Sequence, residues 1–444
     1  MTVPYFLRNI IPRKEGRVGQ EPLLTVLARL TWIQWAHFFI GWLAWTCDNL
    51  DFYSVPLTVN ALGVEFNKST TQITTTITLT LLFRAVGAVI FGILSDRFGR
   101  KWPLVINLII LSILQLGAGF TQTFKQFLAL RALFGIGMGG IWGLGSSTAL
   151  ENLPVEVRGF ASGVVQQGFA VGCILAACVN LTLVQDTAAE WRSLFWTASG
   201  ISLFAAFITA LVPESHVFVR ARAAAKIKGT DSAGRTRIFL RETKTMLKKY
   251  WMLCIYAIFF ATGVNFLAHG SQPPQAFIPL WILPSSFSGL AAGAFCIQFG
   301  VQGAFGVVPV YLAEISPPGF RATFPGTVYQ LGNMASAAAS QIEAKGGENL
   351  RTTVVKDGKV TNVPDYAKVQ GILIGAVVVY LIIVVVFGPE NHSLHFEKHK
   401  VAYEEGVSQE DGVVELQDHQ NGKESSSSHP QSLEEKNEIV VRSA

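Results

Sequence analysis

The chain has 444 residues, of which 50% are hydrophobic and 15% charged, and its mean hydropathy is +0.38. Soluble domains are about a quarter charged, so this composition excludes an ordinary water-soluble enzyme. The net charge of +5 comes from short basic clusters between apolar runs. No basic patch interleaved with stacking aromatics occurs, which argues against a nucleic-acid partner.

The cysteines and the N-terminus carry little chemistry. Cys47, Cys173, Cys178, Cys254 and Cys296 all lie inside apolar stretches without a metal-type CxxC pair. We therefore expect free thiols, no metal site and no cofactor. The first 30 residues hold cations but no apolar run ending in a small-residue cleavage site, so we expect no removable signal peptide.

Six apolar runs come after the N-terminal segment 1–33, and each has about the 20 residues that cross a bilayer core. They are residues 34–58, 72–94, 102–120, 126–148, 160–183 and 191–212. The next stretch, 213–249, carries ten Lys and Arg against three acids. The positive-inside rule places this basic loop in the cytoplasm. Residues 34–212 are thus a six-helix half, and residues 1–33 are cytoplasmic.

Residues 250–388 form a second half with four good spans, at 250–268, 289–312, 322–342 and 369–388. The fragment from Ala276 to Pro284 has about nine residues, too few to cross at 1.5 Å per residue. We expect the loop 343–368 to be extracellular. Residues 389–444 hold twelve acids and the run Ser425–Ser428, which predicts a disordered cytoplasmic tail that trafficking or ubiquitination machinery can bind.

The two halves contain an internal repeat. Gly140–Gly168 aligns with Gly303–Leu331 without a gap, and each copy reads span, short acidic-Pro-Arg loop, span. Such a match indicates homologous halves. The first span begins near Trp35 and the seventh near Tyr250, so the second half is about 50 residues short, the length of two spans with their loop. The sequence therefore predicts an internal deletion after Gln272.

One loop carries a family signature. Gly92–Lys101 fits G-x-x-x-D-[RK]-x-G-[RK]-[RK], and the fourth span contains Arg131-x-x-x-Gly135-x-Gly137-x-Gly139. These residues resemble the major facilitator superfamily, which implies an all-α membrane protein with a two-fold pseudo-repeat helical bundle, here of about ten spans against twelve. Asp96 can then sit at a neighbouring helix N-terminus, where the dipole favours an anion; the alternative is an ordinary positive-inside loop. The predicted gating residues are Asp96, Arg97, Arg100, Glu151, Arg158, Glu314 and Arg321.

The end of the seventh span reads Asn265-Phe-Leu-Ala-His269-Gly-Ser271-Gln272. It is similar to N-x-x-[ST]-H-x-[ST]-Q-D of the fungal monocarboxylate (lactate/pyruvate):proton symporters, a branch of the sialate:proton symporter family. Ala268 replaces the hydroxyl residue, and after Gln272 the chain has Pro273 in place of the signature's Asp. The departure falls where the repeat places the deletion. The resemblance covers about residues 25–395.

Ionisable groups in lipid are costly and therefore functional candidates. Arg131 offers a carboxylate the bidentate guanidinium fork and is the first choice for binding substrate; the alternative is a structural ion pair, and Arg84 is almost as strong a candidate. Asp48, Asp51 and His269 are candidates for proton coupling. The remaining predicted substrate-binding residues are Asn265, His269, Gln272, Gln330 and Asn333.

Two functions remain open at this point. The first is a proton-coupled importer of short monocarboxylates, lactate or pyruvate, that works by alternating access in the plasma membrane. The second is a truncated or mis-assembled product that does not transport, or a transporter of another organic anion or of a sugar. Both interpretations exclude an enzyme, because no catalytic motif occurs in its required context.

Overall fold

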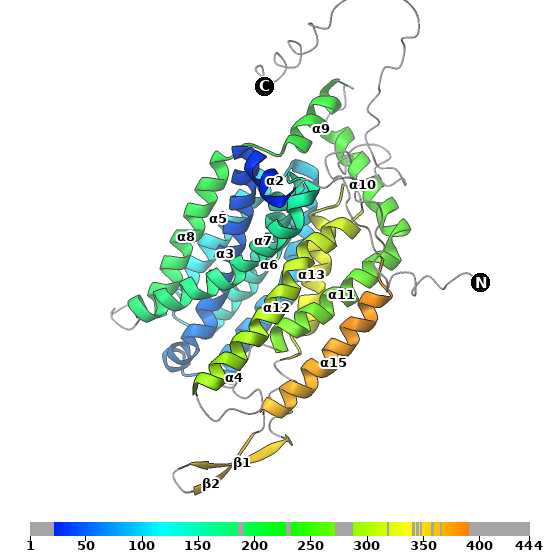
Figure 1. The fold of residues 1–444 in the computed structure, drawn as a ribbon. Coiled ribbons are helices and arrows are strands. Elements are labelled where there is room, and N and C mark those ends of the chain that lie inside the picture. Colours follow the sequence, from blue (N-terminus) through cyan, green and yellow to red (C-terminus); the bar gives the residue numbers. More distant parts are fainter. Residues whose placement is uncertain are drawn as a thin grey trace, which may run out of the picture.

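The protein is a bundle of long helices with a small hairpin at one end, as the computed structural model in Figure 1 shows. The structure describes residues 22–184, 191–227, 232–270 and 287–389, with short gaps between 318 and 365. The predictions for the tail, for Gln272 and for the fragment from Ala276 to Pro284 lie outside the described residues.

The first half contains seven α-helices and a π-helical turn. They are α2 (Leu23–Arg29), α3 (Trp32–Glu65), α4 (Thr70–Phe98), α5 (Lys101–Ala118), α6 (Phe124–Glu151), α7 (Val155–Val179), the π-helical turn η1 (Asn180–Val184) and α8 (Trp191–Leu211). Helices α3, α4 and α6 each begin at a capping box, in which a Ser or Thr and a Gln three residues later satisfy each other's backbone N–H groups. The local sequence therefore sets where these helices start.

The rest of the chain adds α9 (His216–Ile227), α10 (Ser232–Lys249), α11 (Trp251–Gly270), α12 (Phe287–Ile315), α13 (Thr323–Ser336), the antiparallel strands β1 (Arg351–Lys356) and β2 (Lys359–Pro364), and α15 (Tyr366–Val386). The end of the bundle that carries α9 and α10 is called the basic end below. The opposite end carries the hairpin (Figure 1).

Every predicted span coincides with a helix, but several boundaries were wrong. Helices α3, α4 and α6 run past residues 58, 94 and 148, because backbone hydrogen bonds continue after the apolar run stops. Helix α13 ends at Ser336 and not at 342. The basic loop 213–249 is largely helical, and the loop 343–368 contains the β1–β2 hairpin.

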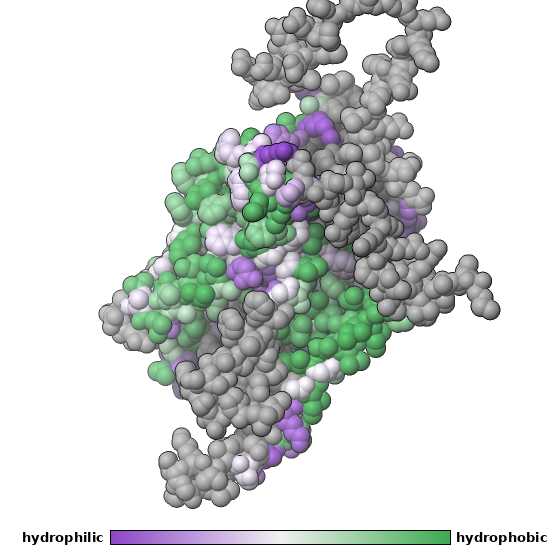
Figure 2. Space-filling view, viewed as in Figure 1, coloured by the Kyte–Doolittle hydropathy of each residue, from purple (hydrophilic) through white to green (hydrophobic). Residues whose placement is uncertain are grey.

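The helices are suited to a bilayer. Among the described residues, six helices are long and apolar enough to cross a membrane, and α2 with α3, bent by 103°, makes a seventh candidate. Figure 2 shows hydrophobic side chains over α8 and over α11 and α15, on the outer surface of the bundle. The chain is a multi-pass membrane protein, and the predicted number of spans in the second half stays a prediction.

Helix packing follows the internal repeat. Helix α3 packs on α7 and α8, and its counterpart α11 packs on α13 and α15. The halves meet where α13 packs on α4 and α6, and where α12 packs on α7. In the first half, α4 also packs on α6, and α5 packs on α8. The repeat makes α12 the counterpart of α6 and α15 the counterpart of α8. Among the described helices of the second half, none is the counterpart of α4 or α5.

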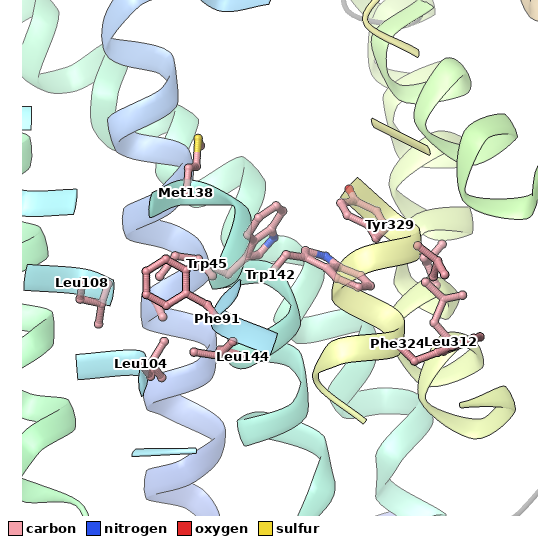
Figure 3. Close-up of a cluster of buried hydrophobic side chains, with 14 of the residues drawn as sticks. Trp45, Phe91, Leu104, Leu108, Met138, Trp142, Leu144, Leu312, Phe324 and Tyr329 are labelled. Atoms are coloured by element: carbon pink, nitrogen blue, oxygen red, sulfur yellow. The ribbon is translucent and has the colours of Figure 1, made fainter. Parts of the chain in front are cut away.

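Two pairs of glycines bring the halves into contact. A Cβ atom on Gly143 would lie 2.8 Å from Gly326 Cα, and one on Gly306 would lie 3.2 Å from Gly163 Cα. The repeat relates these pairs, because residue 143 aligns with 306 and residue 163 with 326. Beside the first pair, the rings of Trp142 and Tyr329 stack 3.9 Å apart across the interface (Figure 3). Backbones approach this closely in membranes only at small residues.

A third glycine position differs between the halves. A Cβ on Gly140 would meet Phe91 of α4 and Asn107 of α5, each at 2.5 Å. The aligned residue, Gly303 on α12, has no described atom within 4 Å of the same point. Gly371 and Gly375 on α15 are likewise open toward the described part of the chain. These glycines lie where a repeat of α4 and α5 would pack.

This difference predicts opposite outcomes for matched substitutions. Gly140→Val should overpack the α4–α5–α6 contact and cost about 1–3 kcal/mol, which lowers the thermal midpoint of the purified protein. Gly303→Val should change the free energy of unfolding by no more than a typical surface substitution, about 0.5 kcal/mol, and so leave the midpoint almost unchanged. Equal destabilisation by both substitutions would contradict an open face at Gly303.

Candidate functional site

A cavity of about 40 Å³ lies between the two halves. Ligand sites form preferentially at such interfaces between two structural units. Helices α3, α4 and α7 line it from the first half, and α11, α12 and α13 from the second. The lining residues are Trp45, Asn49, Phe52, Arg84, Gln166, Phe169, Asn265, Ala268, Val301, Gln302, Phe305, Tyr329 and Asn333.

Arg84 of α4 is the cation in this lining. Its Nη2 donates to Asp48 Oδ2 at 2.8 Å, and both side chains are buried. Arg84 Nε and Asp48 Oδ1 are also buried, and neither has a hydrogen-bond partner in the described part of the chain. A buried guanidinium with unused N–H groups can still take an anionic ligand. The pair is therefore a charge-neutral contact that leaves Arg84 Nε and Asp48 Oδ1 without a partner in the described part of the chain.

Amide side chains surround the ion pair. Asn265 donates to the carbonyl oxygens of Ala261 at 2.8 Å and Tyr329 at 3.3 Å, which fixes it between α11 and α13. Asn333 donates to Gln330 Oε1 at 3.0 Å. Gln166 Oε1 is buried without a described partner. Such groups at the cavity wall can orient a polar ligand.

Aromatic rings form the rest of the wall. Trp45, Phe52, Phe169, Phe305 and Tyr329 all line the cavity. The guanidinium carbon of Arg84 lies 6.0 Å from the centre of the Phe52 ring, at the limit of a cation–π contact. Apolar rings at the wall lower the local dielectric and so strengthen electrostatic contacts in the cavity.

Arg131, the first choice from the sequence, does not line this cavity. Its Nη1 donates to Gln115 Oε1 at 3.0 Å, and its guanidinium carbon lies 4.0 Å from the Phe134 ring centre. Gln115 in turn donates to Ser54 Oγ at 3.0 Å. Arg131 therefore belongs to a polar network among α3, α5 and α6, and its role as substrate ligand stays a prediction.

The two candidate proton sites have different surroundings. Asp51 accepts a hydrogen bond from Ser202 Oγ of α8 at 2.8 Å, whereas Asp48 pairs with Arg84 at the cavity. Three residues apart in the chain, the two carboxylates thus have different partners. The side chain of His269, near the end of α11, lies outside the described residues.

Sequence reasoning missed part of the cavity. Asn49, Gln166 and Gln302 are amides within apolar spans, and buried polar groups in lipid mark functional positions, so that signal was present. The aromatic lining gave no such signal, because aromatic residues are equally common on lipid-facing surfaces.

The predicted gating residues gather at the basic end. Asp96 accepts from the backbone N–H groups of Ala322 at 3.2 Å and Thr323 at 2.9 Å, which places its carboxylate at the N-terminus of α13. Arg100 donates to Asp96 and, at 2.8 Å, to Glu151 Oε2. The position predicted for Asp96, beside a neighbouring helix N-terminus, is confirmed, and the motif joins the two halves.

The other gating candidates lie around this cluster. Arg97 donates to Thr236 Oγ1 of α10 at 2.9 Å, and Arg158 donates to the Leu153 carbonyl at 2.9 Å. Arg321 is buried between α12 and α13, and burial lowers its pKa to about 10, opposed by nearby Glu151. It therefore stays protonated at pH 7. Glu314 lies in the last turn of α12.

A serine reinforces the second glycine contact. Ser162 of α7 donates to the Gly306 carbonyl at 2.6 Å and accepts from the Val310 N–H at 3.1 Å. These two groups would pair with each other in a regular helix, and Pro309 lies beside them within α12. The Ser162 hydroxyl thus bridges a carbonyl and an N–H group of α12 that would otherwise bond to each other. This contact lies within one helical turn of the cavity residues Gln166 and Phe305.

Comparisons with known proteins agree with this architecture. The chain is 30% identical over 429 residues to a carboxylic acid transporter protein homolog of Saccharomyces cerevisiae, covering 82% of this chain and 69% of the yeast protein. It is 26% identical to a probable 4-methylmuconolactone transporter of Cupriavidus pinatubonensis, over 68% of this chain and 81% of that protein. A cis,cis-muconate transport protein of Acinetobacter baylyi is 33% identical over 42% of this chain and 45% of its own length.

Solved structures show the same fold. A double-tryptophan mutant of XylE matches with a TM-score of 0.51 at 15% identity, over 82% of this chain and 98% of that structure. The inward-open xylose transporter XylE from E. coli matches with a TM-score of 0.50 at 18% identity. Residues 23–251 match the family described as sugar (and other) transporter. The chain therefore belongs to the sugar (and other) transporter family of the major facilitator fold, and it is a membrane transporter and not an enzyme.

Proposed function

We propose that this protein has the architecture of a proton-coupled importer of short monocarboxylates, such as lactate or pyruvate, at the plasma membrane. The observation that carries the proposal is Arg84, which lines a cavity between the two halves and pairs with the buried carboxylate of Asp48. A guanidinium is the side chain best matched to a carboxylate. The similarity to a carboxylic acid transporter homolog supports the same class of substrate.

The proposed proton coupling depends on the charge of Asp48, the partner of Arg84. While Asp48 is ionised, it occupies Arg84 and competes with an incoming carboxylate. Protonation of Asp48 releases the guanidinium, so the anion and the proton bind together. Asp51 accepts a hydrogen bond from Ser202, whereas Asp48 is the carboxylate paired with Arg84, so Asp51 is the weaker candidate.

The cluster at the basic end is the proposed gate. Asp96 joins α4 to the N-terminus of α13, and Arg100 joins Asp96 to Glu151 of α6. Opening the cavity toward this end requires the contact between Asp96 and α13 to break, because it ties one half to the other. The Arg100 contacts lie within the first half and hold the Asp96 carboxylate. By the positive-inside rule, this end faces the cytoplasm.

The second candidate function is a chain that binds substrate but does not complete the transport cycle. Gly303 faces no described atom, although its repeat partner Gly140 packs on α4 and α5. The alignment with the yeast relative is 429 positions long, but it contains only 82% of the 444 residues of this chain, which is several tens of residues fewer. The remaining positions are gaps in this chain. Both observations support the loss of a segment about as long as a helix pair, which the internal repeat predicts after Gln272. Alternating access needs two equivalent halves, so this loss should prevent transport.

Uptake measurements distinguish the two candidates. We expect no proton-coupled uptake of labelled lactate or pyruvate by the 444-residue chain in transporter-deficient cells. Uptake should return when about 50 residues that form a helix pair are inserted after Gln272. Surface amounts must be matched between the two versions. Strong uptake by the 444-residue chain would show that the described helices suffice.

The carboxylate ligand can be identified in the version with the inserted pair. Arg84→Lys keeps the positive charge but loses the bidentate fork, so uptake at low substrate concentration should fall about tenfold to a hundredfold, as loss of a hydrogen bond to a charged group predicts. Arg131→Lys is the matched change outside the cavity and should have a smaller effect. The reverse order of effects would return the assignment to Arg131.

Asp48→Asn tests the coupling site. The amide cannot ionise, so Arg84 stays available and substrate exchange should continue, while accumulation against a gradient should be lost. In the unsubstituted protein, uptake should rise as the external pH falls, because protonation of Asp48 frees the guanidinium. Asp51→Asn serves as the control and should still accumulate substrate. If both asparagine variants accumulate it, coupling occurs at another residue.

A further inference from the structure

Four cations of α10 share one face of that helix. Arg237, Arg241, Lys244 and Lys248 recur at i, i+4, i+7 and i+11, which in a helix of 3.6 residues per turn places them in one narrow row. All four are exposed. Arg241 also contacts Glu242 Oε1 at 3.4 Å but keeps 58% of its side chain exposed. These four residues are called the basic stripe below.

The opposite face of α10 is fixed to the bundle. Phe239, Glu242 and Met246 are buried, and the Phe239 ring lies 6.1 Å from the ring of Phe320 in the α12–α13 loop. At the start of the helix, Arg97 of α4 donates to the Ser232 carbonyl at 2.8 Å. Because contacts from both halves hold this face, the basic stripe is turned away from the bundle.

Exposed apolar residues flank the stripe. Leu240 is 62% exposed and Leu247 54% exposed. They lie seven residues apart and so on one side of α10, between the buried face and the stripe. A helix at a membrane surface places such exposed apolar residues among the acyl chains, with its cations toward the headgroups.

Helix α10 also lies directly beside a candidate membrane span. Only Tyr250 separates α10 from α11, a candidate membrane span that begins at Trp251, and Trp251 is 55% exposed. Tryptophan is typical of the interface between headgroups and acyl chains. In Figure 1, α10 ends where α11 begins, and the two helices meet at an angle.

We propose that the basic stripe binds the phosphate-bearing headgroups of anionic phospholipids in the inner leaflet, with Leu240 and Leu247 entering the acyl region. Cations that adjoin a span attract anionic lipid, and each lysine or arginine strengthens the attraction several-fold. Helix α10 contacts Arg97 of the first half and the α12–α13 loop of the second half. Bound lipid would therefore stabilise both contacts, which lie at the basic end beside the proposed gate. The site is separate from the cavity and does not depend on the identity of the substrate.

The test measures lipid binding to the purified 444-residue chain. Fluorescent phosphatidylserine is titrated in dodecyl maltoside micelles, and its anisotropy gives a Kd. Arg237→Gln, Lys244→Gln and Lys248→Gln together should weaken binding at least tenfold. The matched control neutralises three cations of α9, Arg220, Arg222 and Lys226, and should change the Kd less than twofold. Fluorescent phosphatidylcholine should bind weakly to every variant.

Further arms decide what the stripe recognises. Leu240→Ser with Leu247→Ser should weaken binding about threefold without a charge change, and thermal midpoints confirm that each variant folds. Equal weakening by the α9 control would overturn the proposal in favour of overall charge. Competition by glycerophosphoserine at the lipid's own concentration would assign the stripe to free anions. If removing residues after 400 strengthens lipid binding more than tenfold, the acidic tail is the occupant and the lipid proposal fails.

Discussion

Close backbone contact between glycines is the constraint on which the rest of this structure depends. In a bilayer, helices gain no hydrophobic energy by leaving lipid for one another, so van der Waals packing and hydrogen bonds must join them. The Gly143–Gly326 and Gly163–Gly306 contacts provide that packing, and the internal repeat makes them equivalent. They set the spacing between the halves. The cavity and the Asp96 contact both depend on this spacing.

The same constraint explains where charge is tolerated. Ionised groups in the hydrocarbon region are expensive unless paired, and the cavity cation and the basic-end cluster are paired in different ways. Arg100 is held by two carboxylates, Asp96 and Glu151, which makes it a strong link. Arg84 has the single carboxylate of Asp48. Two carboxylates at Arg100 suit a contact that holds Asp96 in place at the gate. The single carboxylate at Arg84 suits a site where a ligand must bind and leave.

The internal repeat and the loop signature predicted the fold well, because both depend on local sequence. Asp96 was expected beside a helix N-terminus, and it lies at that of α13. The choice between Arg84 and Arg131 could not be made in this way. Both are cations within apolar runs, and which one faces the cavity depends on the rotation of α4 and α6, which tertiary packing sets. Helix α10 was missed because it is rich in cations and contains no long apolar run.

The central claim is that a carboxylate binds at Arg84 between the two halves. A cryo-EM structure of the protein in a lipid nanodisc, with pyruvate present at acidic pH, tests this claim most directly. We expect ligand density within hydrogen-bond distance of the Arg84 guanidinium and beside Asn333. Ligand density at Arg131, with the cavity between the halves empty, would contradict the claim.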